Sequence, residues 1–469
     1  MKPSKLTLVI TFILIFWFSL QPAIDPDTGW HIATGRYIVE QKSIPQTDPF
    51  SFSLPNHPYI AHSWGIDIIM YEVDKLAGPV GLSILFALLT TAFFAITYST
   101  INHKSLIINH PFWLLLIAYP AIEIIGTRPQ VITVIGLAWL LRLLTRPLSS
   151  RHIWQIPLGF FIWANLHGGV VLGLVTYGLW LGLSFLLHTY KPVHQIHLLG
   201  LVLLSSAATL LNPYTFHLFT FSWGMITNST SMVYNSDWVP LFSGRLGDDS
   251  LIVRLIIVAG SLIAIFDQKK SAKTLAFLAG GFLLLAFKSL RFLVPLLPVV
   301  TLLVSPMLQK LAGKLTTHQW FFPAVGLVVF SLTFSVLSDK SDVFCSRRPE
   351  CYAKLAEMPF GAVDFMANHH LSGRVFNFYT WGGYLSWQIP DSQVFIDGRM
   401  DNFFVSKKSF LTEFVAIEEQ HKGWYDRLMS YRPQLAIIPV GWQVQQQSLI
   451  LNGWQNLYQD NVAILMQAP

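Results

Sequence analysis

The sequence has few charged residues. Only 12% of its 469 residues are Asp, Glu, Lys or Arg, whereas 53% are hydrophobic. Soluble domains usually carry about a quarter charged residues, so this composition argues against an ordinary soluble protein. The formal net charge of +6 would suit nucleic acid, but no basic block is interleaved with aromatic residues. The basic residues fall between apolar runs instead, as in membrane proteins, and nucleic acid is not an expected partner.

Cysteine is equally scarce. The two cysteines, Cys345 and Cys351, flank the stretch SRRPE. A zinc site would need further Cys or His nearby, and none is visible in the sequence. Two cysteines a short loop apart in an oxidising compartment are expected to form a disulfide.

Long apolar runs are what the first 337 residues contain. They predict about eleven transmembrane helices, although several runs are shorter than the roughly 20 residues that a straight span needs. The first run could be a signal peptide, but the following QPAID is a poor cleavage site, and we expect a retained helix. The predicted spans are 5–22, 79–101, 111–126, 130–145, 153–166, 168–188, 197–211, 251–266, 274–287, 291–308 and 320–337.

The distribution of Lys and Arg predicts the orientation. With the N-terminus in the cytoplasm, the positive-inside rule is satisfied, and the protein is expected in the inner (plasma) membrane. Residues 23–78, 212–250 and 338–469 then lie outside. The basic residues of the inside loops are Lys104, Arg142, Arg146, Arg151, Lys191, Lys269, Lys270, Lys273, Lys310 and Lys314.

The composition changes after Ser338. We therefore predict a multi-span membrane domain over 1–337 and a small extracytoplasmic α/β domain over 338–469. Strands are expected at Arg374–Asn377 and Gln393–Asp397, and in the runs QLAIIPV and NVAILMQ. KKSFLTEFVAIEEQ has helical spacing, as does the stretch from Trp64 to Leu76 in the first outer loop.

The stretch DPDTGWH, residues 25–31, places two carboxylates at the outer end of the first span. One interpretation is that Asp25 and Asp27 only cap a following helix, with Pro26 between them. The other is that they face a cavity and carry chemistry. If the stretch is helical, Asp27 and His31 lie one turn apart on the same face.

Three cations break the positive-inside pattern: Arg128 in GTRPQ, and Lys288 and Arg291 in FKSLRF. They could snorkel to the interface, most plausibly Lys288. They could also bind the phosphate of a lipid, since Arg offers paired donors to phosphate oxygens. Acids and cations on one face are the parts for group transfer from a lipid phosphate to a hydroxyl or amine.

Three further residues lie at predicted outer helix ends: His167 in NLHGG, and Asn212 and Tyr214 in LNPYTF. Each alone is more often structural than functional. The glycines after His167 allow close helix packing.

The chain resembles a known group on several motifs: DPDTGWHIATGRYIVEQKSIPQTDPFSF, NLHGG, LNPY, SLRFLVPLLP and WGGYLSWQIPDSQVFIDGR. They resemble bacterial multi-span proteins related to the GT-C glycosyltransferases, which include polyprenyl-phosphate-sugar transferases and protein O-mannosyltransferases. The resemblance implies a catalytic acid on the first outer loop, which points to Asp25 and Asp27. It also implies a polyprenyl-phosphate-linked sugar donor and a cell-envelope glycan, lipid or protein as acceptor.

Two positions depart from the group's pattern. The group often has Trp where this chain has Gly29, and it tends to show Glu-Trp where this chain has Ser63 followed by Trp64. His62 or Asp67 could take the place of that Glu.

The leading hypothesis is an integral-membrane glycosyltransferase. In it, Asp27 or Asp25 is the base, with a divalent ion such as Mg or Mn an option, and Arg128 and Arg291 hold the donor phosphate. An O-antigen-type polymerase or ligase with a lipid-pyrophosphate donor would depend more on the Arg residues. A scaffold or transporter is the third alternative, but the internal repeats typical of transporters are not evident.

Overall fold

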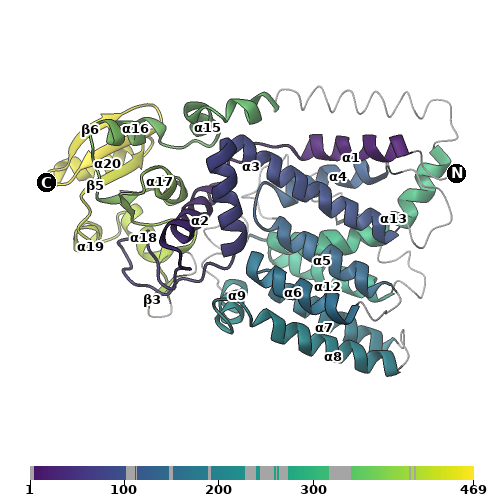
Figure 1. Ribbon diagram of the computed structural model, residues 1–469. Coiled ribbons are helices and arrows are strands. Elements are labelled where there is room, and N and C mark those ends of the chain that lie inside the picture. The colour runs from purple at the N-terminus through teal and green to yellow at the C-terminus, as the bar shows by residue number, and fades with distance from the viewer. Residues whose placement is uncertain are drawn as a thin grey trace. The chain divides into compact units, whose positions relative to one another are not determined.

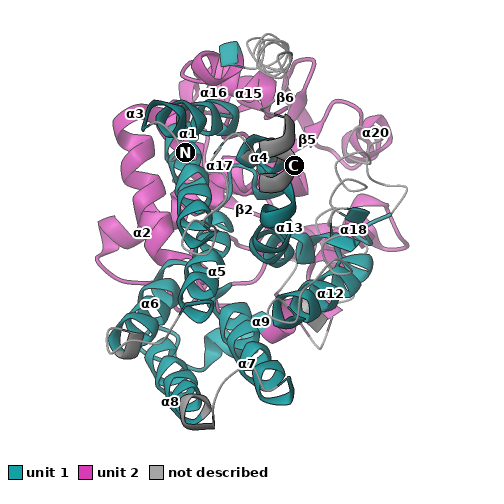
Figure 2. Cartoon of the chain, turned by 90° about the vertical axis from the view of Figure 1, so that its right-hand side faces the viewer, with its two compact units in different colours: residues 1–21, 83–222, 232–341 teal, residues 22–82, 223–231, 342–469 magenta. Residues whose placement is uncertain are grey.

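The computed structural model describes residues 5–101, 111, 113–146, 152–187, 192–227, 239–242, 258–259, 261–262, 273–315, 340–400, 403–405 and 408–469. The chain divides into two compact units (Figure 2). The first unit comprises Met1–Gln21, Ser83–Ser222 and Met232–Ser341. The second unit comprises Pro22–Leu82, Trp223–Ser231 and Asp342–Pro469.

Apolar helices make up the described part of the first unit (Figure 1). They follow the predicted spans closely because each helix ends where Pro, Gly or polar residues interrupt an apolar run. Its helices are α1 (Lys5–Ser19), the second part of α3 (Trp64–Ile101), α4 (Trp113–Ile125), α5 (Val131–Leu144), α6 (His152–Leu166), α7 (Val170–Leu186), α8 (Pro192–Thr209), α12 (Lys273–Lys288), η3 (Leu290–Phe292) and α13 (Leu293–Leu315), while α9 (His217–Thr227) crosses the boundary between the units.

Two described stretches, Trp64–Ile101 and Leu290–Leu308, are long and apolar enough to cross a membrane, and further apolar helices are shorter. These findings support a membrane location. The predicted span at 320–337 and most of that at 251–266 lie outside the described residues, so the number of eleven spans stays a prediction.

Helix α3 contains a break that separates two kinds of sequence. Gly78 has φ 60° and ψ −158°, and Pro79 follows it. Before Gly78 the helix is amphipathic and belongs to the second unit, whose first segment is Pro22–Leu82. The predicted helix from Trp64 to Leu76 is therefore confirmed as the first part of α3.

A five-stranded sheet forms the centre of the second unit, in the order β2-β1-β5-β7-β6. The first three strands are parallel, whereas β7 is antiparallel to both β5 and β6. The strands are β1 (Arg374–Asn377), β2 (Gln393–Val394), β5 (Leu435–Pro439), β6 (Gln455–Gln459) and β7 (Ala463–Gln467).

Helices connect and cover these strands. They are α15 (Pro349–Leu355), α16 (Phe360–Asn368), η4 (Tyr379–Trp381), α17 (Gly382–Gln388), α18 (Leu411–Glu418), α19 (Trp424–Ser430) and α20 (Gln443–Leu451). Cys345 and Cys351 are joined by a disulfide at the start of α15, with Cα atoms 5.7 Å apart.

The prediction of a mostly helical protein with a small C-terminal α/β region is confirmed, but two boundaries were wrong. The strand expected at Gln393–Asp397 ends at Val394, because the chain then turns toward Arg399. The helix expected from Lys407 begins only at Leu411, since Lys408–Ser409 (β4) pairs with Phe404–Val405 (β3). Strand β6 was not predicted; its residues are largely exposed and lack the apolar alternation of a buried strand.

Residues 23–78, predicted as the first outer loop, are built into the second unit. Helix α2 (Thr28–Gln41) packs along α17 (Figure 1). Residues Phe50 and Phe52 each form a backbone hydrogen bond with Val394, which extends the sheet beyond β2. Residues 23–78 and the C-terminal residues therefore share one core, and both segments contribute side chains to the candidate site.

Candidate active site

Asp25 and Asp27 have different local roles at the start of α2. The Asp25 carboxylate accepts a hydrogen bond from the backbone N–H of Asp27 at 2.9 Å, and the Asp25 carbonyl accepts one from the N–H of Thr28 at 3.0 Å. Asp25 thus shapes the turn into the helix, as such side chains commonly do.

Asp27 is the residue before α2, but its side chain makes no capping bond to the helix backbone. Its Oδ1 atom instead accepts a hydrogen bond from the indole Nε1 of Trp30 at 2.8 Å. Asp27 is half-buried, while Trp30 is only 5% exposed. The Asp25 side chain therefore closes the turn before α2, and the capping interpretation does not describe Asp27.

His31, Ser63 and Asp67 form a buried polar cluster next to Trp30. The Nδ1 atom of His31 and the Oδ1 atom of Asp67 are 2.7 Å apart, and the Ser63 hydroxyl donates to Asp67 Oδ2 at 3.2 Å. His31 is 5% exposed and Asp67 is fully buried. The ring of His31 stacks on that of Trp30 with centroids 3.5 Å apart. Asp67 is therefore linked to Asp27 through His31 and Trp30.

This cluster explains the departure at Ser63. Ser63 is buried and belongs to the hydrogen-bonded group around Asp67. His62 lies next to it, with its ring 6.4 Å from that of Trp30. The acid nearest the expected Glu is therefore Asp67, in the first turn of α3.

Glycines allow three stretches of the second unit, DPDTGWH, WGGY and FIDGR, to pack closely against one another. A Cβ atom on Gly29 would collide with the carbonyl of Gly383 in the WGGY stretch. A Cβ on Gly398 in the FIDGR stretch would collide with the Asp27 carboxylate. A Trp at position 29 is incompatible with this packing, so the departure at Gly29 follows from the approach of α2 to α17.

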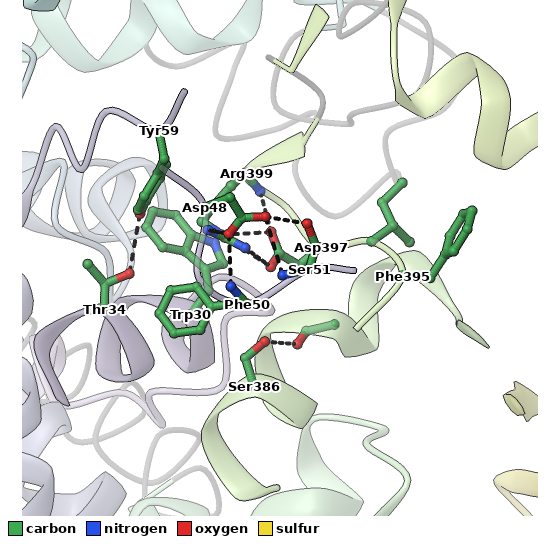
Figure 3. Close-up of polar contacts among 12 residues, drawn as sticks. Trp30, Thr34, Asp48, Phe50, Ser51, Tyr59, Ser386, Phe395, Asp397 and Arg399 are labelled. Atoms are coloured by element: carbon green, nitrogen blue, oxygen red, sulfur yellow. Dashed lines mark hydrogen bonds and ion pairs between the residues drawn. The ribbon is translucent and has the colours of Figure 1, made fainter. Parts of the chain in front are cut away.

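Sequence reasoning missed a second cluster, which centres on Arg399 (Figure 3). Its guanidinium donates to Asp397 from Nε at 2.9 Å and from Nη2 at 2.6 Å, and to Asp48 from Nη1 at 2.7 Å. Arg399, Asp48 and Asp397 are 6%, 7% and 0% exposed. The rings of Phe50 and Tyr59 lie with centroids 4.8 Å from the guanidinium carbon.

The electrostatics of Arg399 identify a structural role. Burial alone would lower its pKa, but the carboxylates of Asp397 and Asp48 raise the pKa well above its ordinary value. All three nitrogens of its guanidinium are engaged by these acids, so the group cross-links the first outer loop to the segment after β2. The available signal was the Asp-Gly-Arg sequence directly after a predicted strand.

The predicted phosphate-binding residues lie in the first unit. Arg128 is half-buried in the turn between α4 and α5, where Gln130 donates to the carbonyls of Ile124 and Ile125. His167 lies at the same end of α5, because its Nδ1 atom accepts hydrogen bonds from the Thr133 hydroxyl at 2.8 Å and from the N–H of Gly169 at 3.0 Å. These two bonds give His167 a structural role at the start of α7.

Lys288 and Arg291 flank the break between α12 and α13. Lys288 ends α12, and Arg291 lies in the short helix η3 that follows. Asn212 closes its own turn, accepting from the N–H of Tyr214 at 2.8 Å and donating to the carbonyl of Thr209 at 2.5 Å. Asn212 is thus structural.

The structure brings Asp25, Asp27, His31, His62 and Asp67 together in the second unit. Pairing of these acids with the cations of the first unit stays a prediction. Within the described ranges, no group of three or more His, Cys, Asp or Glu side chains could hold a metal ion. Asp25 and Asp27 alone could supply two oxygen ligands, which Mg²⁺ accepts when phosphate and water complete its shell.

No protein-family model matches the sequence, and no curated protein matches it. Solved structures do match. The oligosaccharyltransferase AglB from Archaeoglobus fulgidus, in complex with an inhibitory peptide and a dolichol-phosphate, superposes with a TM-score of 0.62 at 8% identity, covering 93% of this chain and 69% of that chain.

A second similar protein is ArnT from Cupriavidus metallidurans bound to undecaprenyl phosphate, with a TM-score of 0.53 at 12% identity, covering 98% of this chain and 97% of that one. ArnT in the apo state gives 0.54 at the same identity. The chain therefore shares the fold of these solved structures. At these identities the likeness establishes the fold, which confirms the predicted fold type, and activity has to be argued from the site.

Proposed function

We propose that the protein is an integral-membrane glycosyltransferase that moves a sugar from a polyprenyl-phosphate carrier to an acceptor on the outer face of the membrane. The observation that carries the proposal is the burial and orientation of the Asp27 carboxylate. It is a half-buried carboxylate that does not cap its helix and is oriented by the indole of Trp30. It stands in the loop after the first helix of a chain with a GT-C fold.

Asp27 would act as the general base. It takes the proton of the acceptor hydroxyl or amine while the acceptor atom forms a bond to the anomeric carbon of the sugar. The bond between that carbon and the phosphate oxygen breaks, and its electron pair leaves with the polyprenyl phosphate. Asp25 would fix the backbone that carries Asp27.

The buried pair of His31 and Asp67 would hold the base in place. Asp67 orients the imidazole of His31, which stacks on Trp30, and Trp30 donates to Asp27. Supporting contacts of this kind keep a catalytic group within about 0.5 Å of its working position.

The cations of the first unit would bind the donor. Arg128 and Arg291 would hold the phosphate as it gains negative charge, with Lys288 beside them. A divalent cation such as Mg²⁺ or Mn²⁺, held by Asp25 and Asp27, would supply further charge stabilisation when bound. The similar structures support this donor class, since AglB was solved with dolichol-phosphate and ArnT with undecaprenyl phosphate.

The direct test replaces Asp27 by Asn. Removal of a positioned base typically costs about 10²–10⁴-fold in rate, so Asp27→Asn should abolish most transfer. Mass spectrometry of cell-envelope glycans with and without the protein identifies the product, and the variant is then compared in the same assay. Asp391→Asn, which removes an exposed carboxylate of the second unit, is the matched control and should retain transfer.

The same experiment separates the alternatives. Transfer that survives Asp27→Asn but is lost in Arg128→Ala would favour a polymerase or ligase with a lipid-pyrophosphate donor. An envelope that is unchanged when the protein is absent would contradict any transferase function.

We further propose that the N-terminus is cytoplasmic and the C-terminus extracytoplasmic, on the distribution of Lys and Arg between loops. A reporter that is active only in the cytoplasm should be silent when fused after Pro469. An active reporter would reverse the topology and move Asp27 to the wrong face.

A further inference from the structure

A groove of about 1190 Å³ lies on the second unit, beside the segment that leads into α2. It is lined by α15, α16, η4 and the turn between β6 and β7. Pro26, the residue between the two candidate acids, also lines it. Pockets for drug-sized molecules occupy roughly 300–1,000 Å³, so this groove is large enough for a ligand of several rings.

One wall of the groove is aromatic. Phe365 and Tyr458, both half-buried, have ring centroids 5.3 Å apart and planes 35° apart. His369 extends this surface by stacking on Phe365 with centroids 3.9 Å apart. Rings that are held against one another in this way offer a rigid face to a ligand.

Hydrogen bonds fix the polar groups of Tyr458 and Asp460 in the groove. The hydroxyl of Tyr458 donates to Asp460 Oδ2 at 3.0 Å, and Asp460 Oδ1 accepts from the N–H groups of Val462 and Ala463 at 2.7 and 2.8 Å. Gly361 makes room for this arrangement, because a Cβ there would collide with Tyr458 and Asp460.

Exposed side chains with planar polar groups line another part of the groove, together with Lys354 of α15. Asp364 and Asn368 project from α16, Glu357 follows α15, and Asn461 lies in the turn after β6. Carboxylates and amides of this kind accept from and donate to neighbouring hydroxyls. A hydrocarbon tail would gain nothing from them, since burial of unpaired carboxylates is costly.

We propose that this groove binds the carbohydrate part of the acceptor, as an oligosaccharide. The C–H faces of its rings would lie on Phe365 and Tyr458, and its hydroxyls would bind the carboxylates and amides. The inference rests on the proposed function, and it names the acceptor class. Because Pro26 lines the groove and joins Asp25 to Asp27, an occupied groove would lead an acceptor toward the proposed base.

The test is binding to the full-length protein in detergent, measured by saturation-transfer NMR. The probes are three trisaccharides: maltotriose, the trimer of N-acetylglucosamine and the trimer of glucosamine. We expect saturation transfer to at least one of them. Binding should weaken at least tenfold in Phe365→Ala and severalfold in Asp364→Asn, a substitution of an exposed side chain that does not threaten folding.

Phe404→Ala is the matched control, because Phe404 is an exposed aromatic residue of the same unit outside the groove. Its binding should equal that of the unmodified protein. Absence of saturation transfer to all three trisaccharides would overturn the proposal. Unchanged binding in both Phe365→Ala and Asp364→Asn would overturn it as well. The measurement needs no turnover, so a failure of Asp27 as base would leave this result unaffected.

Discussion

Two clusters of acids and aromatic residues lie in the second unit, around Arg399 and around Asp27, and the carboxylates at their centres differ in how deeply they are buried. Around Arg399, two carboxylates and three guanidinium nitrogens satisfy one another, and all three side chains are buried. Around Asp27, the carboxylate is half-buried and accepts a hydrogen bond from the indole of Trp30. The first arrangement holds parts of the chain together, whereas the second keeps a carboxylate within reach of water.

The difference shows that acids beside aromatic rings do not indicate function by themselves. A fully paired buried charge cannot take up a proton or bind a substrate without breaking the structure. A half-buried acid with an oriented carboxylate can do both. The predictions below test this contrast between a structural and a functional cluster.

The largest effect is expected at the structural cluster. Arg399→Leu leaves Asp397 and Asp48 buried without their cation, and loss of one partner of a buried pair costs about 3–5 kcal/mol. Thermal unfolding and hydrogen exchange in the second unit would measure this loss of stability.

Arg427→Leu provides the control, because Arg427 and its partner Glu413 are 49% and 30% exposed. An exposed pair contributes about 0–1 kcal/mol, so this variant should unfold almost as the unmodified protein does. Equal losses in the two variants would contradict the assigned difference.

An intermediate effect is expected where the motifs meet. Gly29→Ala places a methyl group against the carbonyl of Gly383, and overpacking of this kind costs about 1–3 kcal/mol. Gly441→Ala is the control, since a Cβ there meets nothing within 4 Å. Denaturant unfolding of both variants measures the difference, and a neutral Gly29→Ala would show that α2 and α17 are not in tight contact.

The smallest effect is expected on the pH dependence of stability, through the half-buried Glu418. Burial, followed by the charge of Glu419, raises the pKa of Glu418 to about 7. Ionisation is then disfavoured in the folded state, so stability should fall as the pH rises from the ordinary value of Glu, 4.5, through about 7.

Glu418→Gln removes this loss. The variant should melt at a higher temperature than the unmodified protein at a pH of about 8 and at the same temperature at about 4. A Glu418→Gln advantage that is independent of pH would point to packing instead.

Much of the fold was predictable, because apolar runs and Gly or Pro breaks determine the helices of the first unit and the strands β1, β5 and β7. The role of Asp27 could be suggested from its place after the first span. The Arg399 cluster could not be found, since Asp48 and Arg399 are distant in sequence and meet only in the folded unit. His31 and Asp67 were named as supporting residues, but their bond depends on how Gly35 lets α2 approach α3.

The second unit is assembled from residues near both ends of the chain, and this has a consequence for its biosynthesis. Residues 22–82 share a core with 342–469, so the early segment has no sheet to join until the late one has been translated. At roughly 5–20 residues per second, that interval lasts on the order of tens of seconds. During it the aromatic residues of the early segment lack the partners that cover them in the folded unit, and the nascent chain is then most prone to aggregation.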